Sequence, residues 1–178
     1  MKKGVLLGSS IFEQWTSAQG RYDGFQLENH AIGGTTADYW AQEIDIALAR
    51  TDYDFVVLYA GSNDFNQGRS VDAITESLGS CITTIRTLLG KNSVAYASII
   101  QAPQKRELGL SEAIEKVNRQ IFDLLEPTDL ALNLNDALAN ENEANLYVED
   151  KLHLTDKAYS LMSAYVIPRL EQWLKAKA

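Results

Sequence analysis

The segment that most constrains the fold is Gly4-Val5-Leu6-Leu7-Gly8-Ser9-Ser10, close to the N-terminus. Its middle is a continuous apolar run, which is typical of a strand buried on both faces of a parallel sheet. Gly8 permits a tight turn, and two hydroxyl side chains follow it. Open α/β sheets bind ligands at the carboxyl ends of their strands, so the hydroxyls are expected at such an edge. Taken alone, the segment favours a simpler interpretation, a turn followed by a serine that caps a helix.

Strand-like and helix-like segments alternate along the rest of the chain. Further strands are expected at residues 25–32, 55–60, 94–100 and 130–134. Helical periodicity is expected at residues 37–49, 71–89, 111–125 and 152–174. This alternation predicts one α/β domain over residues 1–178, a three-layer α/β/α sandwich around a parallel sheet of about five strands.

Glycine and proline predict several element boundaries. Residues 20–24 are turn-like, and Gly90 is expected to close the helix that precedes it. Pro103 should prevent a helix directly behind the fourth strand, and Pro168 should kink or divide the last helix. Residues 11–18 are compatible with a short helix or an irregular loop.

Composition excludes several classes of protein. A formal net charge of -8 leaves no surplus of Lys and Arg to neutralise phosphates, which argues against a nucleic-acid partner. No apolar run approaches the roughly 18 residues of a membrane span, and the N-terminus does not resemble a signal peptide, so we expect a cytoplasmic protein. Cys81 is the single cysteine, expected to be a small buried side chain, so an intrachain disulfide and cysteine metal sites are ruled out.

Four polar segments should meet at one edge of the predicted sheet. Three follow strands, Gly8-Ser9-Ser10, Gly33-Gly34 and Gly61-Ser62-Asn63-Asp64, and the fourth, Asp150-Lys151-Leu152-His153, precedes the last helix. An Asp three residues before a His on a turn can hold the near ring nitrogen and leave the far one free as a base. A serine hydroxyl needs such a base to remove its proton before it can act as a nucleophile at neutral pH. Acyl transfer also forms an oxyanion, which needs hydrogen-bond donors such as the backbone N–H groups of glycine turns and the side chain of Asn.

Each segment also has a simpler interpretation. His153 could be a packed surface histidine, Asp150 and Asp64 could be helix caps, and Gly33-Gly34 could be a plain turn. Their joint occurrence at strand ends in this order favours the catalytic interpretation. His30, the other histidine, is expected inside a strand without an Asp at matching spacing, so it is a weak competitor.

In these four segments the chain resembles the SGNH (GDSL-type) hydrolase family from Gly8 to His153. The resemblance implies a flavodoxin-like fold, Ser10 as nucleophile with Ser9 as the fallback, and Asp150 and His153 as the rest of a catalytic triad. It also implies an oxyanion hole built from the N–H groups of Ser10 and Gly34 and the side chain of Asn63, with no metal or cofactor.

The chain departs from the family pattern at two positions. Ser9 replaces the common Asp, as in a recognised variant that also has the following Ile11 and a nearby Trp15, and Ala31 replaces a frequent glycine. These departures put subfamily and substrate in doubt more than activity.

The sequence is compatible with three functions. The first is hydrolysis of carboxylic esters through an acyl-enzyme, on small soluble or carbohydrate esters, with lysophospholipids and thioesters also in the family's range. The second is a non-catalytic binding module of the same fold. The third is acyl transfer to an alcohol with the same triad. The pocket is expected to be shaped by residues 12–24, 65–69, 102–109 and 142–149.

Overall fold

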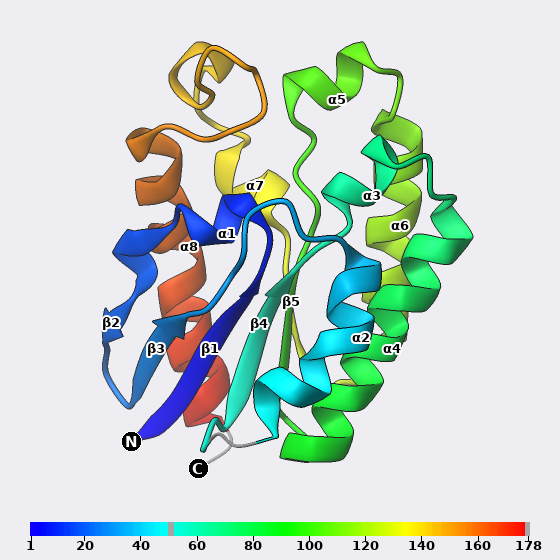
Figure 1. Cartoon of the computed structure of the whole chain (residues 1–178). Helices are drawn as coiled ribbons and strands as arrows, with labels where there is room; N and C mark the ends of the chain where they lie inside the picture. Colours follow the sequence, from blue (N-terminus) through cyan, green and yellow to red (C-terminus); the bar gives the residue numbers. More distant parts are fainter. Residues whose placement is uncertain (50–51, 177–178) are drawn as a thin grey trace.

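A single six-stranded sheet runs through the centre of this computed structural model, which describes residues 1–49 and 52–176 (Figure 1). Its order is β2-β3-β1-β4-β5-β6, and every neighbouring pair is parallel except β2 and β3. The strands are β1 (Lys2–Gly8), β2 (Gly20–Arg21), β3 (Phe25–Asn29), β4 (Phe55–Tyr59), β5 (Val94–Ala97) and β6 (Leu130–Leu132). The five parallel strands therefore have the flavodoxin-like order, with the first strand between the second and the third.

Helices cover both faces of the sheet, which confirms the three-layer prediction (Figure 1). The α1, α7 and α8 helices pack on one face, and α2, α4 and α6 pack on the other. The helices are α1 (Ser10–Glu13), α2 (Ala37–Leu48), α3 (Ser62–Asn66), α4 (Val71–Leu89), α5 (Pro103–Glu107), α6 (Ser111–Leu124), α7 (Leu134–Leu138) and α8 (Asp156–Lys175), with 3₁₀ turns η1 (Thr16–Ala18) and η2 (Glu143–Asn145).

The apolar run in β1 is continuous because the strand contributes to two cores. Leu6 packs in the core beneath α8, while Val5 and Leu7 pack in the core beneath α2 and α4. All three side chains are buried. Cys81 on α4 lies in the second core and is also buried, as its surroundings in the sequence predict.

The carboxyl ends of β3, β1 and β4 lie next to one another. Leu6 pairs with Asn29 on one side of β1, and Gly8 pairs with Tyr59 on the other. A Cβ atom on Gly8 would lie 2.1 Å from the carbonyl oxygen of Tyr59, so only glycine allows this close approach. The chain reverses its direction of strand addition at β1, and such a switch point is where open α/β sheets bind ligands.

Several predicted boundaries were wrong for identifiable reasons. Residues 20–24 are not only a turn, because the two-residue β2 pairs with β3 there. Pro103 does not exclude a helix but begins α5, since the first helical position needs no N–H donor. Pro168 lies inside α8 and does not divide it, and α8 begins at Asp156 and not at residue 152. The α3 and α7 helices are short and were not predicted.

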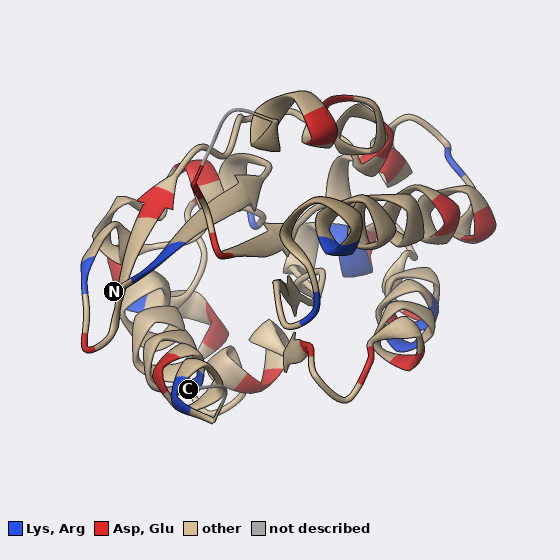
Figure 2. Ribbon diagram, turned by 90° about the horizontal axis from the view of Figure 1, so that it is seen from below, with Lys and Arg blue, Asp and Glu red and all other residues tan. Residues whose placement is uncertain are grey.

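Charged residues are dispersed over the ribbon, with basic positions interspersed among acidic ones (Figure 2). The chain carries 24 acidic and 16 basic residues. Within the two described ranges, every helix is too short or too polar to cross a lipid bilayer.

Candidate active site

Ser10 is the first residue of α1, immediately beyond the end of β1. Ser9 is the N-cap, and its side chain makes no capping hydrogen bond and is buried. The Ser9 N–H donates to the carbonyl oxygen of Tyr59 at 3.2 Å, which continues the β1–β4 pairing by one residue. Ser10 is half-buried, and its N–H has no acceptor within the helix because it lies in the first turn. Of the two serines, Ser10 is the one that presents its side chain outward.

Asp150 and His153 lie on a loop that closes on itself before α8. The loop is held by hydrogen bonds from the Val148 N–H to the His153 carbonyl and from the Lys151 N–H to the Val148 carbonyl, both 2.9 Å. The Asp150 carboxylate accepts hydrogen bonds from the N–H groups of Leu152 and His153, each at 2.9 Å. Asp is favoured in such turns because its side chain can satisfy the backbone two or three residues further on.

The loop brings His153 between Asp150 and Ser10. The Nδ1 atom of His153 lies 2.6 Å from an Asp150 carboxylate oxygen, and its Nε2 atom lies 3.0 Å from the Ser10 hydroxyl oxygen. Because the carboxylate accepts, Nδ1 carries the hydrogen and Nε2 is left to accept from the serine. The geometry is that of a nucleophile, a base and a group that orients the base.

The hydrogen bond from His153, together with the two backbone N–H groups, lowers the pKa of Asp150 from 3.8 to about 2. A carboxyl whose pKa is lower in the folded state stabilises the fold above its unfolded pKa, and this contribution disappears as the pH falls through the folded value. Asp150 is therefore an ionised acceptor for His153 throughout the neutral and weakly acidic range.

This shift predicts a pH-dependent difference in melting temperature between the wild type and Asp150→Asn. Because the carboxylate is about half exposed, we expect the wild type to melt only about 1–4 °C higher between pH 5 and 7. The difference should narrow below pH 3.8 and vanish near pH 2. Melting curves by circular dichroism measure it, and a difference that persists unchanged to pH 2 would contradict the role of the carboxylate.

Gly34 lies in the loop between β3 and α2. The loop is anchored to the end of β1, because the Ile32 N–H and the Thr35 hydroxyl both donate to the carbonyl oxygen of Gly8, at 2.8 and 3.1 Å. Gly34 has φ +77°, which suits the third position of a type II turn. The turn is closed by the Thr35 N–H, which donates to the carbonyl oxygen of Ile32 at 3.4 Å, and does not use the Gly34 N–H.

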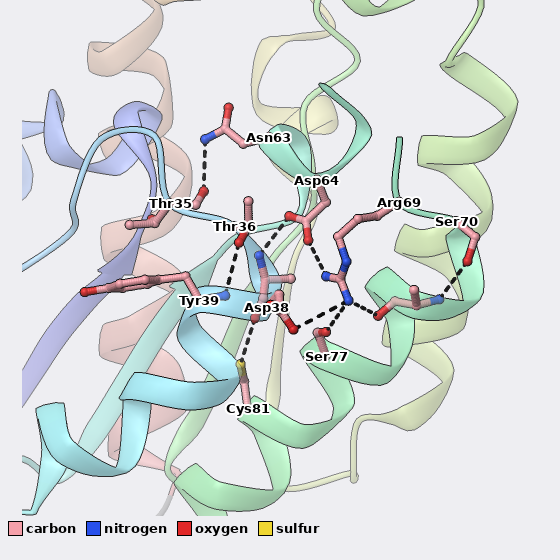
Figure 3. Close-up of polar contacts among 12 residues, drawn as sticks. Thr35, Thr36, Asp38, Tyr39, Asn63, Asp64, Arg69, Ser70, Ser77 and Cys81 are labelled. Atoms are coloured by element: carbon pink, nitrogen blue, oxygen red, sulfur yellow. Dashed lines mark hydrogen bonds and ion pairs between the residues drawn. The ribbon is translucent and has the colours of Figure 1, made fainter. Parts of the chain in front are cut away.

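Asn63 on α3 is tied to the Gly34 loop. Its side-chain NH₂ donates to the carbonyl oxygen of Thr35 at 2.9 Å, which uses one of its two hydrogens (Figure 3). The structure thus brings two of the predicted oxyanion donors together beyond the ends of β3 and β4, the strands on either side of β1. Among the described residues, neither Asn63 nor Gly34 forms a hydrogen bond with Ser10 itself.

Asp64 joins the predicted oxyanion segments to each other, a role that the sequence analysis missed. Its carboxylate is fully buried and accepts from the Ala37 N–H at 2.8 Å and from the Arg69 guanidinium at 2.6 Å (Figure 3). Arg69 in turn donates to the hydroxyl of Ser77 on α4. Ala37 is the first residue of α2, where an N–H lacks a helical partner and a negative charge is favourable. An Asp directly after Asn63 with an Arg five residues later is the only sequence signal for this network.

Two of the segments expected to shape the pocket border the Asp150 loop. Residues 102–109 and 142–149 flank a groove of about 460 Å³ that reaches Lys151. Ion pairs of 2.6 Å join its walls, between Arg106 and Glu143 and between Lys151 and Glu107.

His30 lies outside the site. It follows the end of β3 instead of lying inside the strand, and its ring contacts Glu28 and Tyr53 on the surface.

The fold and this arrangement define a three-layer α/β protein with Ser10, His153 and Asp150 aligned at the carboxyl edge of the sheet. A model of the GDSL-like lipase/acylhydrolase family matches residues 6–161. The chain belongs to that family, and its membership indicates ester hydrolysis in general. Curated proteins give no match.

Solved structures share the fold at low sequence identity. A lipolytic protein of the G-D-S-L family from Veillonella parvula has a TM-score of 0.81 at 16% identity, covering 94% of this chain and 97% of that one. The psychrotrophic esterase EstA from Pseudoalteromonas, in a structure inhibited by monoethylphosphonate, has a TM-score of 0.76 at 18% identity, covering 98% and 100%. A carbohydrate esterase family 3 protein from Talaromyces cellulolyticus has a TM-score of 0.74 at 23% identity, covering 99% of both chains.

Proposed function

We propose that the chain hydrolyses carboxylic esters through an acyl-enzyme on Ser10. The observation that carries the proposal is the continuous path from the Ser10 hydroxyl to His153 at 3.0 Å and from His153 to Asp150 at 2.6 Å. The histidine in such a path takes the serine proton as the oxygen attacks. Without a base, a serine hydroxyl is a poor nucleophile at neutral pH. Family membership supports the reaction class.

The reaction has two halves. The Ser10 oxygen attacks the ester carbonyl while His153 Nε2 takes its proton, and the carbonyl oxygen becomes an oxyanion that the N–H groups of Ser10 and Gly34 and the Asn63 amide stabilise. The oxyanion collapses, the ester C–O bond breaks, and His153 returns the proton to the departing alkoxide. Water then attacks the acyl-enzyme with His153 as base, and the acid leaves as Ser10 regains its proton. None of these steps needs a metal or a cofactor.

For the substrate we favour a small soluble or carbohydrate ester. The excess of acidic residues disfavours an anionic lipid surface as the site of action. Similarity in fold to a carbohydrate esterase is compatible with this choice. A profile over acyl chain lengths from acetate to decanoate, with an acetylated sugar included, ranks the candidates directly. Added methanol that diverts the acyl group to a methyl ester would reveal transfer to an alcohol.

The proposal is tested by covalent labelling with a fluorophosphonate probe, which requires an activated serine. We expect rapid, stoichiometric labelling of the wild type at Ser10, located by peptide mass spectrometry. Ser9→Ala should label like the wild type, and Ser10→Ala should not label. A wild-type protein that binds small esters but never reacts with the probe would instead be a binding module, and the proposed function would be wrong.

A further inference from the structure

Lys105 on α5 is a buried cation that donates hydrogen bonds to two neutral acceptors. Its side chain is fully buried, and its ammonium donates to the carbonyl oxygen of Ser62 and to the side-chain oxygen of Asn66, both at 2.9 Å. Across residues 1–49 and 52–176 it takes part in no ion pair. Burial lowers its pKa, as expected for a charge taken out of water. An ammonium held only by neutral acceptors is costly compared with an apolar side chain of the same length.

Both acceptors belong to α3, the helix that carries Asn63. Ser62 is the first residue of α3 and Asn66 is the last, so the ammonium binds groups that both ends of the helix contribute. The Ser62 carbonyl and the Asn63 N–H belong to one peptide group, and Lys105 therefore holds the backbone unit directly before Asn63. A five-residue helix whose N-cap, Gly61, has no side-chain capping bond has little stability of its own.

The backbone of α5 is in turn fixed to the Asp150 loop. The Gln104 N–H donates to the carbonyl oxygen of Lys151 at 3.0 Å, and Lys151 also pairs with Glu107. Lys105 thus extends from an element attached to the Asp150–His153 loop to the helix that carries Asn63. It therefore connects the two parts of the proposed catalytic site, the loop with Asp150 and His153 and the helix with Asn63.

We propose that Lys105 is a positioning residue for the ester hydrolysis: it holds α3 so that the Asn63 amide is placed before the oxyanion forms. The inference rests on the proposed function, in which Asn63 is an oxyanion donor. Donors of this kind act only when they are preorganised, and displacement by about 1 Å can cost about 100-fold in rate.

A double-mutant cycle between Lys105 and Asn63 tests the proposal. Assays use p-nitrophenyl acetate well below the melting temperature of each variant. We expect Lys105→Met to lower kcat about 30-fold with KM within about twofold, and Asn63→Ala to lower kcat about 100-fold. The double variant should be only about two- to threefold slower than Asn63→Ala, because the position of α3 ceases to matter once the amide is gone. Lys116→Met, on the exposed face of α6, is the matched control and should behave as the wild type.

The outcomes distinguish failure of the positioning role of Lys105 from failure of the proposed function. If Asn63→Ala loses activity but Lys105→Met does not, or if the two losses multiply to about 3,000-fold, the positioning role is wrong and the proposed function stands. If Asn63→Ala has wild-type kcat, both the oxyanion role and the positioning role are wrong. Should Lys105→Met fail to fold, Asn66→Ala removes one acceptor at an exposed position. We expect it to lower kcat about threefold, without adding to Asn63→Ala, and wild-type kcat would then overturn the proposal.

Discussion

We expect Ser10→Ala to fold normally and to lose turnover of p-nitrophenyl acetate by about 10⁴-fold or more. The hydroxyl makes the 3.0 Å contact with His153 and is only partly buried, so its removal deletes the proposed nucleophile without leaving a cavity in the core. Steady-state rates and a circular dichroism melting curve measure the two effects. The residual rate should be that of an oriented water molecule beside the proposed oxyanion donors, which the substitution leaves in place.

Ser9→Ala is the matched control, since it removes the neighbouring hydroxyl from the same turn. The Ser9 side chain makes no capping bond, and its contribution to the structure is through its backbone. We therefore expect its activity to stay within a few-fold of the wild type. Loss of activity in Ser9→Ala together with its retention in Ser10→Ala would transfer the nucleophile's role to Ser9.

We expect the largest loss of stability from Asp64→Asn, which keeps the shape of the side chain and removes its charge. The single oxygen of the Asn amide cannot replace both carboxylate oxygens, which accept from the Ala37 N–H and from Arg69. The guanidinium, only 22% exposed, then keeps only the more distant, half-exposed Asp38 as a counter-charge. Breaking a buried pair from one side costs about 3–5 kcal/mol, which corresponds to a fall in Tm of about 6–20 °C in a chain of this size.

Asp38→Asn provides the comparison for Asp64→Asn. Its carboxylate lies 3.7 Å from the same guanidinium but is half exposed, so the cost should stay below about 1 kcal/mol. Urea unfolding of both variants measures the free energy of unfolding. Equal, small losses would show that Asp64 does not hold the Gly34 and Asn63 segments together. A large loss for Asp64→Asn alone would support the network that Figure 3 displays.

Much of the architecture could be predicted because its signals are local. The unbroken apolar run at Val5 to Leu7 indicates a strand between two cores, and a strand-end glycine followed by hydroxyls indicates the edge where a site lies. The spacing of Asp150 and His153 predicts their contact, since three residues of turn bring a carboxylate to the near ring nitrogen. The order of strands, with β1 in the centre, agrees with the flavodoxin-like prediction.

Other boundaries could not be predicted because propensities are weak beside tertiary packing. Pro168 is expected to kink or divide the last helix, yet it does not divide α8, whose buried side, including Val166 and Leu170, packs on the sheet. Pro103 is expected to prevent a helix behind the fourth strand, but it begins one, because it lies at the first position of α5. The two-residue β2 has no strand signal and exists only because it pairs with β3.

The sequence by itself determined the kind of sheet and the strand ends at which polar segments gather, and its resemblance to a family implied the residues proposed for catalysis. The sheet and its strand ends depend on contacts within a few residues or on the hydrophobic period, which the chain displays directly. Only the tertiary structure decided what holds these segments in register: Asp64 with Arg69 between α2 and α4, and Lys105 beneath α3. A charged residue in the sequence normally indicates a solvated surface. Its burial depends on which distant elements close over it, and no local pattern contains that information.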